Sequence, residues 1–187
     1  MGKEEILELT VRREIYNHIL QAPGLHEREL SRKLNIPLST LNYHLKYLKK
    51  RNLLSSSLDG LYTRYYVVGE IGSEDRKVIG VLRQKVPRKI VLFLLLNSRC
   101  NHRDIYNHVG VAPSTASFHL NKLAEFDVIT RMQTGRETVY HIKNPEHISD
   151  LLITYKKSFF DSAVDSFVDT WFELHPRNLK KPEKNEE

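Results

Sequence analysis

The chain has 187 residues, 40% hydrophobic and 28% charged, and its single cysteine excludes an intrachain disulfide and a cysteine-based zinc cluster. Its length allows one large domain or two small ones, and its formal net charge of +6 favours a polyanionic partner without proving one. The sequence shows no signal peptide and no apolar run long enough to span a membrane, so we expect a soluble, cytoplasmic protein without a membrane partner.

The first third of the chain predicts three helices followed by a β-hairpin. Periodic apolar residues place the helices at about 4–21, 26–34 and 38–51. Pro23 and Pro37 fall at the two junctions, where one helix ends and the next begins. A strand that opens at Leu53 and a β-rich strand at 61–68 flank the pair Asp59-Gly60, which is typical of a hairpin turn.

The middle third repeats the first with an offset of 75 residues. When 13–67 is placed over 88–142 without a gap, the identical pairs include Ser39/Ser114, Thr40/Thr115 and His44/His119. The second copy therefore predicts helices near 87–97, 102–109 and 113–125, and a hairpin at 128–142. Because a gap-free register over three helices and a hairpin is improbable by chance, we interpret the chain as a duplicated small domain.

A helix, a helix–turn–helix and a two-stranded wing make up the layout of a winged-helix domain. The expected fold is therefore mainly α with small β-wings, built from two tandem winged helix-turn-helix domains and a long C-terminal helix. The boundaries that we predict are 1–71 for domain 1, 72–145 for domain 2, 146–175 for the C-terminal amphipathic helix and 176–187 for a disordered tail.

The third helix of the first copy has one apolar face and one face suited to nucleic acid. Leu41, Leu45 and Leu48 share the apolar face. The opposite face and its flanks collect small, amide, aromatic and basic side chains, namely Ser39, Asn42, Tyr43, Lys46, Tyr47 and Lys50. Base edges and phosphates require such groups, and no acid occurs between Ile36 and Leu58.

The equivalent helix of the second copy carries this pattern more weakly. Its polar face holds Ser114, Ser117, Phe118, Asn121 and Glu125. Phe118 is apolar and Glu125 would repel phosphate, so an alternative is that this helix packs on protein. The second copy would then bind DNA through its wing, where Arg131 and Arg136 bracket the turn, and through the basic segment 76–89.

The basic residues are concentrated in parts of the chain. Residues 76–143 hold 12 basic and 4 acidic groups, a net charge of +8, whereas 144–187 hold 6 basic and 9 acidic groups, a net charge of −3. A second cluster, from 28 to 51, has seven basic residues and one acid. Each run taken alone is also compatible with a solvated face, and the repeat is what favours a binding role.

Residues 39–48 (STLNYHLKYL) and 114–123 (STASFHLNKL) resemble the recognition helix of ArsR/MarR-type winged-helix regulators. Residues 49–54 and 124–129 resemble the helix-to-wing transition of that family. Two copies in one chain resemble archaeal tandem winged-helix regulators, of which one group controls archaellum operons, although nothing physical in this chain points to motility. The Cys-x-Cys of metal-sensing ArsR proteins is missing, which puts metal sensing in doubt.

The histidines do not form a site by their spacing. His44 and His119 each precede a core leucine, and we expect them to be half-buried and bonded to backbone, with phosphate contact as the alternative. His102 and His108 are six residues apart and do not share a helix face, so no metal site is expected. The sequence has no nucleophile–base set, Gly-rich phosphate loop or paired carboxylates, so we expect neither an enzyme nor a cofactor.

The segment from His147 to Leu174 contains no Gly or Pro and predicts one long helix. Its apolar residues recur every seven positions on one stripe and form a second stripe beside it, so the helix cannot lie free in water. Two readings remain open. The helix pairs with its copy in a homodimer through 147–174, or it folds back on its own two domains. Its acidic residues argue against contact with DNA.

Together, the patterns and the resemblance predict a transcriptional regulator that binds double-stranded promoter DNA with both third helices and both wings. The residues expected to neutralise phosphates are Lys46, Lys50, Arg64, Arg131 and Arg136. The residues expected to read bases or position the helices are Ser39, Thr40, Asn42, Tyr43, Ser114, Thr115, Ser117, Phe118 and Asn121. The alternatives are a winged-helix adaptor that binds transcription-machinery or other proteins, and an RNA-binding protein.

Overall fold

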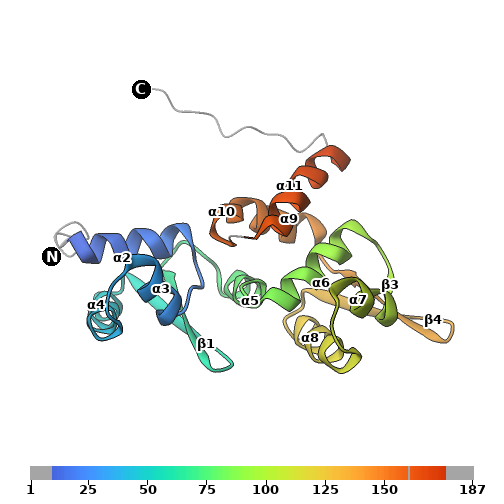
Figure 1. Cartoon of the computed structure of the whole chain (residues 1–187), viewed down its shortest axis with the longest axis horizontal. Coiled ribbons are helices and arrows are strands. Elements are labelled where there is room, and N and C mark those ends of the chain that lie inside the picture. Colours follow the sequence, from blue (N-terminus) through green and yellow to red (C-terminus); the bar gives the residue numbers. More distant parts are fainter. Residues whose placement is uncertain (1–9, 160, 176–187) are drawn as a thin grey trace.

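The computed structural model describes residues 10–159 and 161–175, and its first third consists of three helices and a hairpin (Figure 1). The helices are α2 (Thr10–Gln21), α3 (Glu27–Leu34) and α4 (Leu38–Lys50). The antiparallel strands β1 (Leu54–Asp59) and β2 (Tyr62–Val67) follow. The predicted start of the first helix, 4–9, and the predicted tail, 176–187, lie outside the described residues.

The second copy has the same elements 75 residues later. Its helices are α6 (Lys85–Leu96), α7 (His102–Val109) and α8 (Pro113–Glu125), and its hairpin is formed by β4 (Ile129–Thr134) and β5 (Glu137–Ile142). A short strand that the sequence did not predict, β3 (Cys100–Asn101), pairs with β5. In the first copy the equivalent pairing is reduced to a single bridge between His26 and Arg64.

The repeat extends to the backbone torsions. Residues with left-handed backbone fall at equivalent positions of the two copies, with φ of 51° and 73° at Asn35 and Gly110, 57° and 61° at Asn52 and Asp127, and 59° and 62° at Gly60 and Gly135. The first pair ends α3 and α7, and the last pair turns the two hairpins. The two copies therefore close their helices and wings by the same local devices.

Each copy buries its own apolar core at the positions that the helical period predicts. Ile15, Leu30 and Leu45 are buried in the first copy, and their counterparts 75 residues later are buried in the second. Leu41 and Leu48 are likewise fully buried, which confirms the apolar face assigned to the third helix. Burial of each such side chain contributes about 1.5–3 kcal/mol to folding, so these residues hold the three helices together.

The helix α5 (Ser73–Leu82) connects the two copies and was not predicted. Its apolar side packs on both copies, because Ile79 lies in a small core with Tyr66 of β2, whereas Val81 and Leu82 belong to the core of the second copy. The hydroxyl of Tyr66 donates a hydrogen bond to the carbonyl of Arg76 at 3.0 Å. The connection between the copies is therefore a packed helix.

The predicted single helix over 147–174 is wrong, because this segment forms three helices. They are α9 (Pro145–Thr154), α10 (Lys156–Phe159) and α11 (Ser162–Leu174). Polar side chains bind the backbone at the break, where the Ser158 hydroxyl donates to the carbonyl of Tyr155 at 2.6 Å. The Asp161 carboxylate then accepts from the amide of Ala163 at 3.0 Å, so it caps the start of α11.

The apolar stripes of this segment are buried within the chain itself. Ile148, Leu152, Phe167 and Trp171 belong to the same core as the helices of the second copy. Of the two readings of this segment, the one in which it folds back is the one observed. Pairing of two chains through 147–174 stays a prediction.

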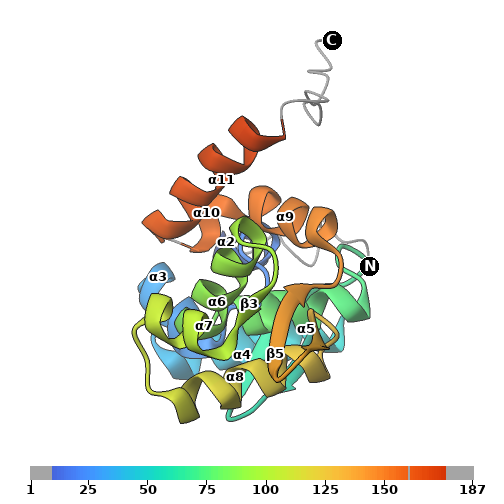
Figure 2. The ribbon, with the colours of Figure 1, turned by 90° about the vertical axis from the view of Figure 1, so that its right-hand side faces the viewer.

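The three-helix end of the chain and the third helices of the two copies lie on opposite sides of the molecule. In Figure 1 and in the perpendicular view of Figure 2, α4 and α8 lie in the lower half, whereas α9 and α11 lie above them. Within the described ranges, no helix has the length and apolar character needed to cross a lipid bilayer.

Candidate nucleic-acid interface

The exposed face of α4 carries most of the side chains that the sequence assigned to DNA binding. Tyr43 is 62% exposed, and Ser39, Thr40, Lys46 and Lys50 are exposed as well. Asn42 is half-buried. Neither lysine forms an ion pair or hydrogen bond within the described residues, so both ammonium groups are free to meet phosphate. This face is therefore polar, basic and exposed to solvent among the described residues.

The exposed face of α8 resembles that of α4 most closely at one position, which carries an exposed aromatic ring in both helices. Phe118, the counterpart of Tyr43, is 64% exposed. Each ring also stands edge-on to the histidine that follows it, with centroids 5.2 Å apart at Tyr43–His44 and 5.1 Å apart at Phe118–His119. Neither ring is buried by the fold, so both rings are available to a partner at equivalent positions of the two copies.

The polar residues of α8 are partly engaged within the second copy. The Ser117 hydroxyl and the imidazole Nε2 of His102 are 2.9 Å apart, so Ser117 links α8 to α7. Asn121 accepts a hydrogen bond at 2.7 Å from Arg131 of β4, which ties the helix to its wing. Ser114 and Asn121 are exposed, and Thr115 is half-buried.

The second wing presents its basic residues to solvent. Arg131 and Arg136 are both exposed, and Arg136 stands directly after Gly135 at the turn between β4 and β5. Arg136 forms no ion pair or hydrogen bond inside the part of the chain that the structure covers. The second wing therefore keeps one cation oriented by Asn121 and one cation free.

Arg64 corrects the prediction for the first wing. This residue was expected to neutralise phosphate, but only 3% of it is exposed. Its guanidinium donates to the Asp59 carboxylate at 2.7 Å and to the carbonyl of Gly24 at 2.8 Å. A guanidinium held by a buried carboxylate and a backbone carbonyl has a structural role, because release to phosphate would leave both acceptors unpaired.

The basic segment 76–89 is also largely used inside the molecule, contrary to its predicted role in binding. Arg83 donates to the carbonyls of Pro23 and Ser158 at 2.7–2.9 Å, and Arg88 donates to the Asp161 carboxylate at 2.5 and 2.9 Å. These contacts join residues 60 to 75 positions apart in the chain. Charge alone could not distinguish such internal ties from a DNA-binding patch.

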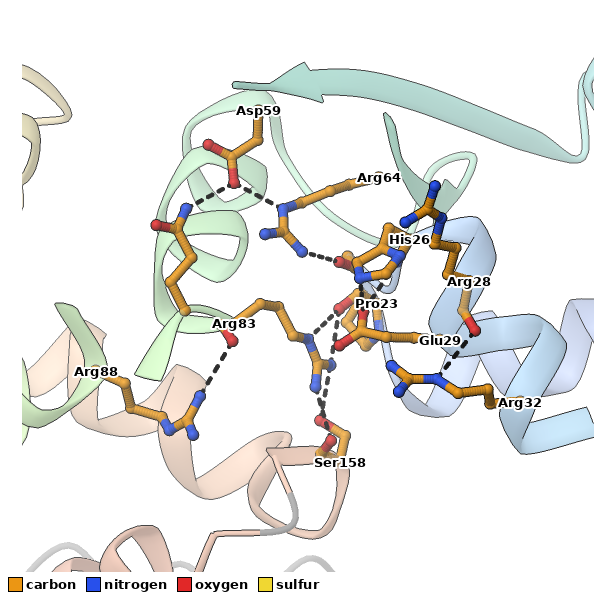
Figure 3. A network of polar contacts seen from close by, with 12 residues as sticks. Pro23, His26, Arg28, Glu29, Arg32, Asp59, Arg64, Arg83, Arg88 and Ser158 are labelled. Atoms are coloured by element: carbon orange, nitrogen blue, oxygen red, sulfur yellow. Dashed lines mark hydrogen bonds and ion pairs between the residues drawn. The ribbon is translucent and has the colours of Figure 1, made fainter. Parts of the chain in front are cut away.

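A cluster of polar residues connects the first wing to α8. The carboxylate of Asp59, at the end of β1, accepts from the guanidinium of Arg64, as Figure 3 shows. It also accepts from the side-chain amide of Gln84 at 3.0 Å and from the ammonium of Lys122 at 2.6 Å. We call Asp59, Arg64, Gln84 and Lys122 the Asp59 cluster. Burial acts to raise the pKa of Asp59, but the bonds and charges of Lys122 and Arg64 outweigh it and hold that pKa below its ordinary value.

Comparisons with known proteins match both copies separately. A family model described as an N-terminal HTH domain matches residues 9–79, and the bacterial regulatory protein family arsR matches residues 87–131. The chain is a tandem winged helix-turn-helix protein. One description names a helix-turn-helix domain and the other a family of regulatory proteins.

The tandem winged-helix protein also has a relative in an archaeon. It is 34% identical over 142 residues to the uncharacterized HTH-type transcriptional regulator MJ1398 of Methanocaldococcus jannaschii. The match covers 76% of this chain and 36% of the relative, so the chain corresponds to only about a third of that protein's length.

The histidines that follow the exposed rings differ from their prediction in one respect. His44 is buried and His119 half-buried, but the Nδ1 atom of each ring has no hydrogen-bond partner in the described ranges, so the expected bond to backbone is wrong. Burial lowers the pKa of both rings, helped by the positive charge of Arg12 at His44 and of Lys122 at His119. Among the described residues, no group of histidine, cysteine and carboxylate side chains forms a metal site.

Sequence reasoning missed Lys122, Gln84 and Asp59 as a connected set. Lys122 occupies the position of Tyr47 in the first copy, where the Arg12 guanidinium stacks 3.7 Å from the ring centroid. An aromatic ring in the first copy is thus replaced by a cation in the second. This difference between the copies is the sequence feature that could have indicated a separate role for Lys122.

Proposed function

We propose that the protein is a transcriptional regulator that binds double-stranded DNA sequence-specifically, with α4 and α8 each entering a major groove. The observation that carries this proposal is the pair of equivalent exposed rings, Tyr43 and Phe118, on two helices that lie on the same side of the molecule (Figures 1 and 2). A winged helix places its third helix in the groove, and both ring positions lie on that helix.

The other site residues fall into two groups under this proposal. Lys46, Lys50, Arg131 and Arg136 neutralise phosphates, because all four are exposed cations on α4 or on the second wing. The residues that read base edges or position the helices are Ser39, Thr40, Asn42, Tyr43, Ser114, Thr115, Ser117, Phe118 and Asn121. Arg64 is not part of this set, because it is buried against Asp59.

A salt titration of duplex-DNA affinity tests the proposal. The logarithm of affinity should fall linearly with the logarithm of salt concentration, with a slope of about −0.9 for each phosphate contact. The double variant Lys46→Gln and Lys50→Gln should lower the affinity and reduce the magnitude of that slope by about 1.8, two contacts' worth. A slope that stays unchanged in this variant contradicts the assignment of α4.

The matched control is the double variant Lys156→Gln and Lys157→Gln. These lysines are on α10, on the side of the molecule away from α4 and α8, and Lys156 lies 3.6 Å from Asp165 and from Asp169. The control removes the same net charge from the chain, so it should leave the slope where it was. An equal loss in both variants would assign the effect to net charge alone.

A second candidate function is a protein–protein adaptor, and the chemistry of α8 favours it. Phe118 is a large apolar side chain in solvent, and the exposed carboxylate of Glu125 follows on the same helix. Under this reading α4 binds DNA or a protein, and α8 binds a protein of the transcription machinery. Phe118→Ala would then abolish capture of that protein and leave the affinity for duplex DNA unchanged.

A further inference from the structure

A basic cavity lies where the first copy, the start of the second copy and the C-terminal helices meet. It has a volume of about 320 Å³ and is lined by Leu25, Glu29, Arg32, Lys33, Arg83, Arg88, Ser158 and Phe159. Figure 3 shows several of these side chains converging from α3, from the chain between α5 and α6, and from α10. Four of the eight lining residues are cations and one is an acid.

Two of the cations are fixed in place by the surrounding backbone. Arg83 is held by Pro23 on one side and by Ser158 on the other, where its guanidinium donates to both the carbonyl and the hydroxyl at 2.7 and 2.9 Å. Arg88 is held by Asp161 and by the carbonyl of Leu82 at 2.8 Å. The walls of the cavity are therefore built before any ligand arrives, which lowers the cost of binding.

Arg88 is paired with the Asp161 carboxylate, and the other three lining cations outnumber the single lining acid, Glu29. Arg32 donates from its Nε to the carbonyl of Arg28, and its two terminal nitrogens have no partner among the described residues. The single lining acid, Glu29, is engaged at 3.1 Å by the backbone amide of His26. A guanidinium fork with both terminal nitrogens free is the group that binds phosphate or carboxylate in a bidentate manner.

The cations also act on one another. Burial lowers the pKa of Lys33, and the positive charge of Arg83 lowers it further, while Glu29 only partly opposes this. Burial likewise lowers the pKa of Arg83, and although Glu29 raises it, the charges of Arg64 and Arg88 add to the lowering. An anion between these groups would relieve their mutual repulsion.

We propose that this cavity binds a small organic anion that carries a phosphate group. The phosphate would meet Arg32 and Lys33 at the face of α3, with Arg83 and Arg88 behind it. Leu25 and Phe159 supply an apolar wall for the organic part of the ligand, and a volume of about 320 Å³ suits a small metabolite. The cavity is lined by residues of α3, α6 and α10, by Leu25 before α3 and by Arg83 between α5 and α6, and by none from α4 or α8.

Because the residues that line the cavity come from separate parts of the chain, a bound anion would hold those parts together. Ligand that binds only the folded chain raises its stability with the logarithm of ligand concentration. The anion should therefore raise the midpoint of thermal unfolding of the full chain, and it should do so without DNA. This readout does not depend on the proposed function.

The experiment is a calorimetric titration of the full chain with sodium pyrophosphate, in sodium chloride of matched ionic strength. Saturable binding at one site per chain is expected. Arg32→Gln should weaken it about tenfold, or about 1.4 kcal/mol. Arg28→Gln is the matched control, since Arg28 lies on the same helix, is exposed and does not line the cavity, and its carbonyl remains for Arg32. Circular dichroism verifies that both variants are folded.

Several outcomes would overturn the proposal. Heats that do not saturate, or equal weakening in the Arg28 and Arg32 variants, would show only diffuse attraction to a basic chain. Citrate that binds as tightly as pyrophosphate would overturn the assignment to phosphate. Loss of pyrophosphate binding in the variant Lys46→Gln and Lys50→Gln would place the bound anion on the α4 face, where a DNA phosphate would lie.

Discussion

The ammonium of Lys122 lies 2.6 Å from the carboxylate of Asp59, so a residue of the helix α8 is bonded to the end of the first wing's first strand. Both side chains are mostly buried, with 19% and 9% exposed. The contact joins two copies of one repeat across 63 positions of the chain. This bond sets the position of α8 relative to the first wing. It thereby sets the spacing between α4 and α8, the two helices proposed to enter DNA.

Lys122→Met should therefore loosen the junction between the copies. The loss of a charged hydrogen bond in a mostly buried place should lower the free energy of unfolding by about 2 kcal/mol. The affinity for a DNA site that spans both third helices should fall as well, while a half-site should bind as before. Chemical denaturation and a pair of long and short duplexes measure the two effects.

Lys143→Met is the control for that variant. Lys143 also pairs with an aspartate, Asp127, but these side chains are 50% and 65% exposed. Exposed pairs contribute about 0–1 kcal/mol, so this change should leave both stability and DNA affinity nearly unchanged. If both lysine variants lose the same stability, the Asp59 cluster does not join the copies.

Asp161→Ala should destabilise the C-terminal helices. The change removes the cap of α11 and leaves the guanidinium of Arg88, itself buried, without its carboxylate. A lost cap costs about 1 kcal/mol and an orphaned buried charge about 3–5 kcal/mol, so a loss of about 4 kcal/mol is expected. The fluorescence of Trp171 on α11 reports the change.

The control for Asp161 lies one turn along α11. Asp165 is 58% exposed and is 3.6 Å from Lys156, so Asp165→Ala should cost less than about 1 kcal/mol. A small effect at Asp161 together with a similar effect at Asp165 would mean that the Arg88 pair does not hold the C-terminal helices to α6.

Stability should fall as the solution becomes acidic, and His44 and His119 should account for part of this fall. Burial lowers the pKa of both rings below the ordinary value of 6.5. The unfolded chain then binds protons that the folded chain does not, so the stabilisation is complete above about pH 6.5 and is lost as the pH falls toward the folded values.

The double variant His44→Phe and His119→Phe should therefore flatten the pH dependence of the free energy of unfolding between pH 6.5 and pH 5. It should not remove the dependence, because burial also lowers the pKa of His18 and His26. Urea titrations at a series of pH values test this. A slope as steep as that of the parent chain would show that neither ring titrates with unfolding.

Tyr43→Ala and Phe118→Ala should weaken specific DNA binding by about tenfold each, since the loss of recognition at one base pair costs about 1–3 kcal/mol. Because both rings are more than 60% exposed, the midpoint of thermal unfolding should change little. Binding to competitor DNA of random sequence should change less than binding to the specific site. If only Tyr43→Ala weakens specific DNA binding, the result favours the alternative in which α8 binds a protein.

Much of the fold could be predicted because local patterns determine it. The 75-residue repeat located α3, α4, α7 and α8 to within a residue, since apolar periodicity, prolines and turn residues act over a few positions. The exposed faces of α4 and α8 follow from the same periodicity, which is why Tyr43, Lys46 and Phe118 are found in solvent as expected.

The predictions that proved wrong depend on tertiary contacts, which local patterns do not reveal. Residues 147–174 have the pattern of one long helix. However, Arg83 binds Ser158 and Arg88 binds Asp161, and these two bonds hold the backbone between α10 and α11. Arg64 reads as a wing cation, yet it is buried beside Asp59. The partners of Arg83 and Arg88 are 75 and 73 positions away in the chain. Arg64 is held by Asp59 on the paired strand, five positions away, and by the carbonyl of Gly24, 40 positions away.

By itself, the sequence determined the two copies, their third helices and the residues those helices present to solvent, because each depends on contacts within a few turns. Only the tertiary structure decided which of the many basic residues are available. Arg64, Arg83 and Arg88 are fixed inside the molecule, whereas Lys46, Lys50 and Arg136 are exposed and have no partner within residues 10–159 and 161–175. A cation's role depends on the nearest acceptor in space, and that acceptor is set by how the copies and the C-terminal helices pack together.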